Sequence, residues 1–501
     1  MTIIKQKDFE ESIASALQYI SYYHSEDFIL AMTKAYEMEE SVPAKDAILQ
    51  ILTSSKLSAF GNRPICQDTG IVTVFIKQGM GVAWEASATV EEMVNQGVRD
   101  AYLDKTNPLR ASIVSDPLGK RTNTNDNTPA ITHISMVKGD SIEVTVAAKG
   151  GGSENKAHLA MLNPSDSVVD HVLKIIPTMG AGWCPPGVLG IGIGGTADKA
   201  MLLAKESLMD PIDIQELIKN GTKNNVEALR MELYEKVNSL GIGAQGLGGL
   251  TTVLDVKIKD YPTHAASLPV AIIPNCAANR HIHFKLNGDG PVVLKPPNLK
   301  LWPKTSWKPN SEALNVNVND IVKTDMKNWK IGQTLLLSGK ILTARDAAHK
   351  KIQDLLGKGK PLPLELNLKN KFLYYVGPVD AVRDEVVGPA GPTTATRMDK
   401  YTDLMLDKCG VICMIGKAER GAEAITSIKN NKATYLIAVG GAAFLVSQAI
   451  KSSKVVAFPE LGMEAVHEFE IENMPVTVAV DTNGLSIHNR GMSEWKSLKI
   501  K

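Results

Sequence analysis

The chain has 501 residues, of which 44% are hydrophobic and 22% charged, a composition ordinary for a soluble globular protein of two or three domains. Its 55 basic and 54 acidic side chains leave a formal net charge of +1, which gives no electrostatic reason to expect nucleic acid or an anionic membrane as a partner. Aromatic residues make up only 5%, which argues against stacking surfaces for bases.

The N-terminus shows no sign of a targeting segment. The first 18 residues are acidic and amphipathic, without a basic start, an apolar stretch or a small-residue cleavage site. No run reaches the roughly 18 apolar residues that a membrane-spanning helix needs. We therefore expect a cytoplasmic protein, or one of another reducing compartment.

Hydrophobic periodicity predicts a helical start followed by mixed helices and strands. Residues 8–57 show apolar side chains at helical spacing and should form two or three amphipathic helices. Residues 131–137 and 142–148 should be two paired strands joined by a turn. Other strands are predicted at 71–76, 188–195, 251–258 and 268–273, and helices at 90–103, 165–175, 198–208 and 212–240.

Prolines interrupt the periodicity between residues 286 and 311, which predicts a linker. Strand and helix patterns then alternate, as in an α/β domain of about 180 residues. Its strands are predicted at 335–344, 372–376, 411–415, 434–439 and 455–458, its helices at 346–356, 394–407 and 422–429, and a final hairpin at 476–487. The predicted division is an N-terminal domain over 1–285, a linker over 286–319 and a C-terminal domain over 320–501.

Three of the five cysteines have unusual sequence surroundings. An odd number of cysteines in a chain this long is no disulfide framework, so free, buried thiols are the default expectation. Cys66, Cys184 and Cys276 each lie in a turn rich in Pro, Gly or Asn, whereas Cys413 lies inside an apolar strand. Because loops on a rigid scaffold collect ligands, these three thiols are candidate metal ligands, and Cys409 and Cys413 are bystanders. Three thiolates on an iron–sulfur cubane would leave one iron open as a Lewis acid, which suits catalysis.

Seven spaced motifs together resemble those of class I fumarate hydratases, an iron–sulfur family. They are CQDTG at 66–70, KGGGSENK at 149–156, CPP at 184–186, ARDAAH at 344–349, GPAGPTTATRMD at 388–399, IGK at 415–417 and PELGMEA at 459–465. The resemblance runs through nearly the whole chain, which looks like the α and β portions of the family's two-subunit branch fused together. The family also contains L-tartrate dehydratases and mesaconase-like enzymes, so tartrate and mesaconate stay open as substrates.

The resemblance implies a role for individual residues. It makes Cys66, Cys184 and Cys276 the ligands of a 4Fe-4S cluster with one iron not ligated by protein, and Thr393 the catalytic base beside the carboxylate of Asp68. Positions similar to the family's substrate contacts are Gln67, Arg110, Gly152, His264, Arg345, Arg397 and Lys417. The implied fold is α/β, with an α+β N-terminal lobe that carries the cluster and a swivelling C-terminal lobe of the β/β/α type. The implied enzyme is an oxygen-sensitive homodimer with its active site between the lobes.

These residue types suit a hydro-lyase of the tricarboxylic acid cycle that acts on a small dianion. Arginine forms bidentate pairs with carboxylates, so the three arginines just named, with Lys417, would hold the substrate. Proton removal beside a carboxylate needs a strong electrophile, which the open iron would supply. A threonine hydroxyl is a very poor base unaided, so Thr393 must be tuned by Asp68, Arg397 and the substrate. A non-enzymatic iron sensor would keep the cysteines but need not keep Thr393, Arg397 and Lys417.

Three other patterns have competing interpretations. Residues 190–195 match G-x-G-x-x-G, with Asp210 near the expected distance, but no second mononucleotide half follows, so we expect close backbone packing and no dinucleotide. His281 and His283 would need a third ligand to bind zinc. The glycines of 149–153 lack the ending of a phosphate loop and should let backbone N–H groups approach a carboxylate.

Overall fold

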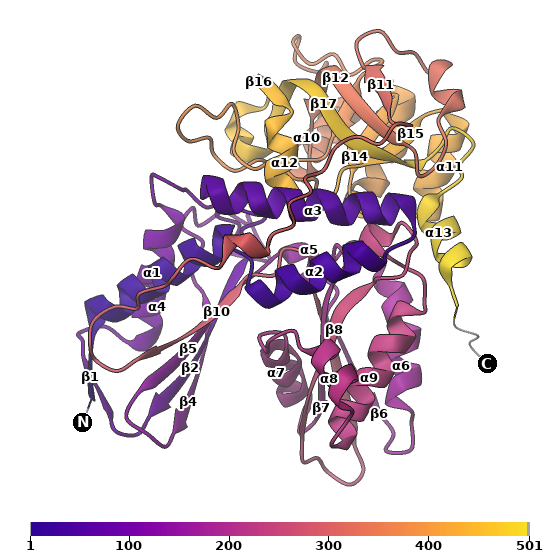
Figure 1. Ribbon diagram of the computed structural model, residues 1–501. Coiled ribbons are helices and arrows are strands. Elements are labelled where there is room, and N and C mark those ends of the chain that lie inside the picture. Colours follow the sequence, from indigo (N-terminus) through magenta and orange to yellow (C-terminus); the bar gives the residue numbers. More distant parts are fainter. Residues whose placement is uncertain (1, 498–501) are drawn as a thin grey trace.

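Four β-sheets with their covering helices make up the computed structural model, which describes residues 2–497 (Figure 1). Three sheets belong to the chain before residue 290, and the fourth, of seven strands, follows residue 313. Helices and strands are mixed throughout, so the α/β class predicted from the sequence is confirmed. None of the helices within these residues combines the length and the apolar character needed to cross a bilayer.

Six strands and two helices build the first part of the N-terminal region. They are β1 (Thr2–Lys5), α1 (Gln6–Tyr22), β2 (Ile71–Gly79), β3 (Val82–Glu85), α4 (Val90–Tyr102), β4 (Ile131–Val137), β5 (Ile142–Lys149) and β10 (His281–Leu286). The main sheet has the order β10-β5-β2-β4, and α1 and α4 share a hydrophobic core with it. The predicted pairing of β4 with β5 is wrong, because β2 lies between these two strands and pairs with both. The segment that connects β4 to β5 passes the end of β2, where the Gly79 N–H donates to the Ser141 carbonyl (2.9 Å).

The second part of the N-terminal region is a four-stranded sheet between helices. Its elements are α5 (Gly151–Glu154), β6 (His158–Leu162), α6 (Val168–Ile175), β7 (Gly187–Gly194), α7 (Ala197–Ser207), α8 (Ile214–Asn220), α9 (Asn225–Asn238), β8 (Val253–Tyr261) and β9 (Leu268–Asn275). In the order β6-β9-β7-β8, α7 covers one face, and α6 and α9 cover the other (Figure 1). The single helix predicted over 212–240 is two helices, because the chain turns at Gly221, whose φ of +75° favours glycine.

The C-terminal region is built around a sheet that closes on itself. Its elements are β11 (Leu314–Asn317), β12 (Thr334–Thr343), α10 (Asp346–Gly357), β13 (Phe372–Tyr374), β14 (Cys413–Gly416), α11 (Ala422–Asn430), β15 (Thr434–Ile437), α12 (Ala443–Gln448), β16 (Ile450–Ala457), β17 (Val466–Val480) and α13 (Ile487–Trp495). The order is β11-β12-β13-β14-β15-β17-β16, and β17 also pairs with β12. The hairpin predicted over 476–487 has its turn at 481–484, but α13 follows in place of a strand.

The helix predicted over 394–407 is replaced by irregular turns. A 3-10 turn spans Ala395–Tyr401 and a π turn spans Leu404–Lys408. Within the first turn, Asp399 accepts a hydrogen bond from the buried Arg420. Helical periodicity could not indicate this contact, because Arg420 lies outside the segment. Tertiary contacts therefore override local helix propensity in this segment.

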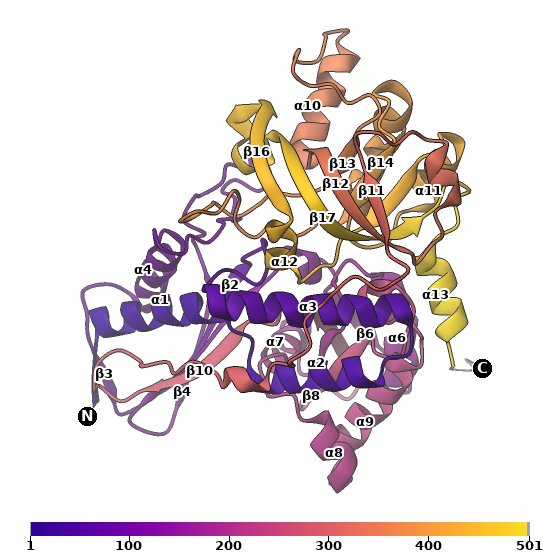
Figure 2. The same cartoon turned by 45° about the horizontal axis from the view of Figure 1, so that its top comes forward.

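Two long helices lie between the N-terminal sheets and the C-terminal region (Figure 2). They are α2 (Glu26–Met38) and α3 (Val42–Gly61), and one hydrophobic core joins their side chains to those of the C-terminal strands. Residues 287–313 pass along α3, where the Trp302 indole donates to the Ser55 hydroxyl (2.9 Å). The two regions are thus packed together, and loops from both meet at their interface.

Candidate active site

A cavity of about 230 Å³ lies where loops of the two regions meet. Eight residues that the sequence marked as catalytic or substrate-contacting line it: Gln67, Asp68, Arg110, Gly152, Arg345, Thr393, Arg397 and Lys417. Five further lining residues, Gly151, Asn155, Lys156, Thr394 and Thr396, were not singled out, although all five lie inside motifs of the sequence resemblance. The sequence motifs therefore contain these five residues, but they do not show which side chains face the cavity.

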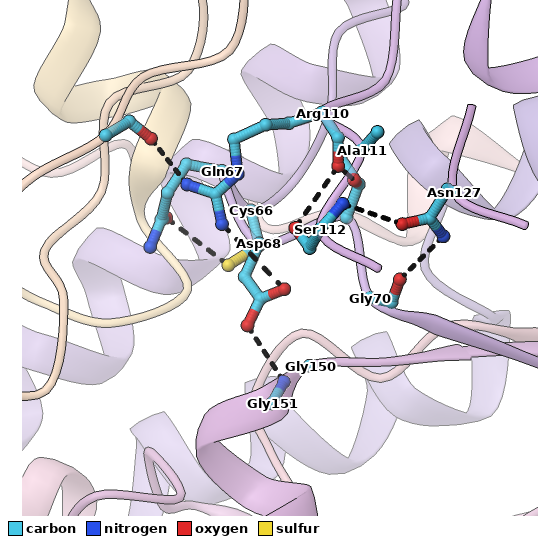
Figure 3. A network of polar contacts seen from close by, with 12 residues as sticks. Cys66, Gln67, Asp68, Gly70, Arg110, Ala111, Ser112, Asn127, Gly150 and Gly151 are labelled. Atoms are coloured by element: carbon cyan, nitrogen blue, oxygen red, sulfur yellow. Dashed lines mark hydrogen bonds and ion pairs between the residues drawn. The ribbon is translucent and has the colours of Figure 1, made fainter. Parts of the chain in front are cut away.

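The loop between α3 and β2 brings Gln67 and Asp68 to the cavity (Figure 3). The Gln67 side chain donates from Nε2 to the Pro392 carbonyl of the C-terminal region (3.1 Å). The Gly151 N–H donates to Oδ2 of Asp68 (2.9 Å), which is the approach of a glycine backbone to a carboxylate that the sequence predicted. Residues on both sides of the interface therefore fix this loop.

Asp68 is a carboxylate held ionised by its neighbours. Burial by itself would raise its pKa, but Arg110, Arg280 and Lys417 outweigh burial and hold that pKa below its ordinary value. Nη2 of Arg110 is 3.9 Å from Oδ1 of Asp68. Asp68 therefore partly balances a cavity that is otherwise rich in positive charge.

Two arginines of the cavity are almost fully buried and keep free donors. The side chains of Arg110 and Arg345 are 9% and 11% exposed, and the Nε of each lacks a hydrogen-bond partner among the described residues. Arg110 donates from Nη1 to the Gly377 carbonyl (2.6 Å), and Nη2 of Arg345 lies 3.6 Å from Oε1 of Glu464. Burial, followed by the like charge of Arg345, lowers the pKa of Arg110 to about 10, which leaves it charged at neutral pH. Such a pair has the positive charge and the free donors that a small anion requires.

Arg397 sits at the more open side of the cavity. Its side chain is 43% exposed, and its Nη2 is 3.2 Å from Oδ2 of Asp346, the first residue of α10. An exposed ion pair of this kind contributes little to stability. Arg397 is therefore free to exchange Asp346 for a ligand carboxylate.

The backbone fixes Thr393 beside Lys417. The Thr393 N–H donates to the Tyr375 carbonyl (2.7 Å), and the Lys417 N–H donates to the Thr393 carbonyl (3.1 Å). Thr393 is buried, and both residues line the cavity. The side-chain amine of Lys417 also donates a hydrogen bond to the thiol sulfur of Cys184 (2.9 Å).

The three candidate cysteines come from three separate turns and lie together behind the cavity. Cys66 and Cys276 belong to one small apolar cluster with Ile65 and Ala278, and the Ala277 N–H donates to the Cys184 carbonyl (3.1 Å). Among residues 2–497, no three His, Cys, Asp or Glu side chains are placed to hold a single metal ion. In a cubane, however, each cysteine binds a different iron, so its ligands need not converge on one point.

Burial disfavours negative sulfur at these thiols, whereas the neighbouring cation favours it. Burial raises the pKa of the Cys184 thiol to about 11, so an isolated thiol there would stay protonated. Burial would also lower the pKa of Lys417, but negative charge at Cys184, Cys66 and Cys276 outweighs it and raises that pKa above its ordinary value. A metal that replaces the thiol protons would leave the sulfurs negative, and Lys417 already lies against Cys184 as a counter-cation.

The other two cysteines lie elsewhere in the C-terminal region. All five cysteines are free, as expected. Cys413 is buried in β14 within a core of aliphatic and aromatic side chains, and Cys409 packs half-buried against the core shared with α3. Neither lines the cavity.

His264 does not reach this cavity. It lies exposed in the loop between β8 and β9, where its Nδ1 accepts a hydrogen bond from the Ala266 N–H (3.1 Å). This loop precedes β9 and Cys276 follows it, so His264 is roughly 25 Å away at the opposite end of an eight-residue strand. The sequence alone could not indicate this separation, because the separation depends on the direction of the strand.

The glycine run of β7 packs against a helix. A Cβ on Gly190 would lie 2.2 Å from the Ala204 carbonyl oxygen, and a Cβ on Gly192 would lie 1.9 Å from that of Ala200. Close packing of β7 on α7 therefore explains these glycines, as the sequence interpretation preferred. Asp210, the acidic residue of the dinucleotide pattern, pairs instead with Lys259 (3.0 Å).

The histidines of β10 have local partners. Nε2 of His283 lies 2.6 Å from the Met209 carbonyl, and Nδ1 of His281 lies 3.1 Å from Oδ1 of Asn279. Two histidines without a third ligand make no zinc site in the described residues.

Comparison with known proteins identifies the family of this chain over nearly its whole length. A family model described as Fumarate hydratase (Fumerase) matches residues 10–285, and one described as Fumarase C-terminus matches residues 288–491. "Fumarate hydratase class I, anaerobic" of Escherichia coli (strain K12) is 33% identical, over 90% of this chain and 83% of that protein. "Fumarate hydratase 2" of Leishmania major is 30% identical, over 98% and 87%. "Putative L(+)-tartrate dehydratase subunit alpha" of Methanocaldococcus jannaschii is 40% identical, over 52% and 90%. The chain belongs to the class I fumarate hydratase family.

Proposed function

We propose that this protein is a fumarate hydratase, a hydro-lyase that reversibly adds water to fumarate to give (S)-malate. The observation that carries the proposal is one cavity in which the buried donors of Arg110 and Arg345 meet Thr393 and the Lys417 amine bound to Cys184. The relatives named fumarate hydratase class I support the same activity.

Cys66, Cys184 and Cys276 would hold a 4Fe-4S cluster with one iron not ligated by protein. The donor set fits such a group, because it offers three free thiols from separate turns and a cation, Lys417, against one of them. When bound, the cluster supplies a Lewis acid that polarises the hydroxyl added to or lost from the substrate. Free thiols of this kind stay reduced in the cytoplasm, where we place the enzyme.

The residues of the chain bind and orient the dicarboxylate. Arg110 and Arg345 take one carboxylate through the donors that the protein leaves unpaired, and Arg397 takes the other by releasing Asp346. Asp68 stays ionised and holds Arg110 in place. These fixed charges restrict the substrate to one orientation, which is a large part of the catalytic advantage of a bound substrate.

Thr393 moves the proton at the carbon beside the bound carboxylate. In dehydration its hydroxyl oxygen takes that proton while its own proton passes to the ionised carboxylate of Asp68 in the same cavity, and in hydration both transfers run in reverse. Its backbone is clamped on both sides, by Tyr375 and by Lys417, so the hydroxyl keeps its position during the reaction.

The proposal extends to the organisation of the chain. We propose an α-type domain over 1–285, a linker over 286–319 and a β-type domain over 320–501, and the junction between the two family matches supports this division. We also propose a homodimer. Because His264 is exposed and far from the cavity of its own chain, a role in substrate binding requires that it enter the cavity of a second copy.

L-Tartrate dehydration is the second candidate function. The 40% identity of residues in the N-terminal half to a putative tartrate dehydratase subunit favours it over mesaconate hydration, which is the third candidate. Anaerobically reconstituted enzyme should show its highest kcat/KM with fumarate among these three substrates. A higher kcat/KM with tartrate or mesaconate would transfer the assignment to that substrate.

Thr393→Ala tests the proton-transfer step. It should lower kcat by about 100-fold or more, which is the usual contribution of a positioned acid–base group. Iron content must remain at the wild-type level, and the exposed Thr426→Ala serves as the matched control. Full activity in Thr393→Ala with a normal iron content would refute the assigned role.

A further inference from the structure

Arg280 is a buried arginine whose side chain has no hydrogen-bond partner among residues 2–497. It follows Cys276 by four residues, in the turn between β9 and β10, and is 2% exposed. Nε, Nη1 and Nη2 all lack a hydrogen-bond partner among the described residues, whereas its backbone carbonyl accepts from the Ala148 N–H (3.0 Å). The backbone is therefore anchored, and the charged end of the side chain is unpaired.

An unpaired guanidinium at this depth requires a counter-charge. Arginine stays protonated in proteins, and an uncompensated buried charge costs several kcal/mol. Two other buried arginines show the usual solution: Arg63 pairs with Glu385, and Arg420 pairs with Asp399. Arg280 has no such ion pair within the described residues.

Arg280 lies in the turn that carries Cys276 and does not line the substrate cavity. A Cβ built on Gly150 would lie 3.8 Å from Nη2 of Arg280 and 3.2 Å from Oδ2 of Asp68, so the two groups flank Gly150. The oxygens of Asp68 are already engaged by Gly151 and Arg110, and Arg280 does not line the cavity. The charge of Arg280 also acts on the thiol of Cys66, and cysteine sulfur becomes negative when it binds a metal.

We propose that Arg280 is a positioning residue of the metal site, whose guanidinium donates hydrogen bonds to the sulfur of the cluster held by Cys66, Cys184 and Cys276. This inference rests on the proposed function. Lys417 neutralises the Cys184 side of the site, and Arg280 neutralises the side away from the substrate. Hydrogen bonds and positive charge at the sulfurs favour the reduced cluster, so Arg280 also protects the open iron from oxidation.

The test uses full-length protein reconstituted without oxygen as wild type, Arg280→Gln and Arg280→Lys. Two readouts are independent of turnover: the cluster's reduction potential, and the rate at which a chelator removes iron. Arg280→Gln should have a more negative potential and should release iron about tenfold faster, the usual effect of losing one outer contact of a metal site. Arg280→Lys keeps the charge but loses the planar fork, so its potential should shift less.

Arg230→Gln is the matched control, because Arg230 is a largely buried arginine paired with Asp213 and Asp255, away from the cavity. It should lower the melting temperature and leave the potential and the iron release unchanged.

Wild-type values of both readouts in Arg280→Gln would overturn the inference. If Arg280→Gln does not fold, iron release from Arg280→Lys decides, with wild-type release contradicting the contact. Failure of the wild type itself to bind iron and sulfide would contradict the proposed function instead.

Discussion

Arg345 shows at the scale of single residues why we propose that the cavity binds a carboxylate. Its side chain is 11% exposed, its Nε has no partner in the described part of the chain, and its nearest carboxylate, on Glu464, is 3.6 Å from Nη2. A protein that buries a guanidinium and leaves its donors free loses stability unless an anion completes the site. The structure therefore favours function over stability at this position.

Arg345→Lys should raise the KM for fumarate by about 10- to 100-fold, because an ammonium cannot reproduce two parallel hydrogen bonds to one carboxylate. Steady-state kinetics under anaerobic conditions measure this change, with kcat expected to fall less than KM rises. Arg490→Lys, at an exposed ion pair on α13, is the control and should change neither. An unchanged KM in Arg345→Lys would show that Arg345 does not hold the substrate.

Most site residues were predictable because they occur in turn-rich motifs, where chemistry is the main reason for their identity. Arg280 was not predictable, because a lone arginine in a turn carries no signal until its burial is known. The place of His264 was also not predictable, since the sequence around it gives no information on which end of β9 faces the cavity. Sequence thus identifies the chemical groups, and three-dimensional structure decides which of them meet.

At the scale of elements, helix α10 links the cavity to the C-terminal core. Arg345 precedes its first residue, and His349 lies one turn further on, fully buried, with its ring 5.3 Å from that of Tyr401. Nδ1 of His349 lies 2.7 Å from the Arg345 carbonyl, which makes Nδ1 the protonated nitrogen of a neutral ring. Packing of this ring therefore helps to position Arg345.

The buried His349 makes stability depend on pH. Burial lowers its pKa to about 4 in the folded protein, against about 6.5 when unfolded, so the unfolded state binds the proton first as the pH falls. The stability from the neutral ring is complete above pH 6.5 and is lost as the pH falls toward 4, by on the order of 3 kcal/mol. Urea unfolding at a series of pH values should show a shallower loss in His349→Asn, whose amide can replace the Nδ1 donor. Identical pH slopes in both proteins would contradict this account.

The types of most elements followed from periodicity, but their partners did not. The pairing of β4 with β5 was predicted from their closeness in sequence, whereas β2 inserts between them. The helix predicted over 394–407 is lost because distant residues, such as Arg420, bind side chains within it. Both errors come from contacts between residues far apart in the chain, which local patterns do not encode.

At the scale of the whole molecule, the N- and C-terminal regions depend on each other. The core around α3 includes side chains of both, and Arg63, three residues before Cys66, donates to Glu385 and to the Asp380 carbonyl of the C-terminal region (2.8 and 2.7 Å). The cavity itself is lined from both sides. A fused chain guarantees that the two halves of the site are present in equal amounts.

Limited trypsin digestion tests this organisation. Lys304 is exposed between Trp302 and Trp307, which are anchored to α3, whereas Lys295 and Lys308 precede proline and resist trypsin. Cleavage after Lys304 should give two fragments that co-elute in gel filtration under native conditions and separate in urea, because the shared core holds them together. Separation of the fragments under native conditions would show that the interface is weak.

The central claim is that Cys66, Cys184 and Cys276 hold one cluster, and iron and acid-labile sulfide counts per chain after anaerobic reconstitution test it most directly. Wild type, Cys409→Ala and Cys413→Ala should each contain about four irons and four sulfides, while alanine at any of the three ligand positions should remove most of both. A wild-type protein without iron and sulfide, or wild-type counts in all three ligand variants, would contradict the account.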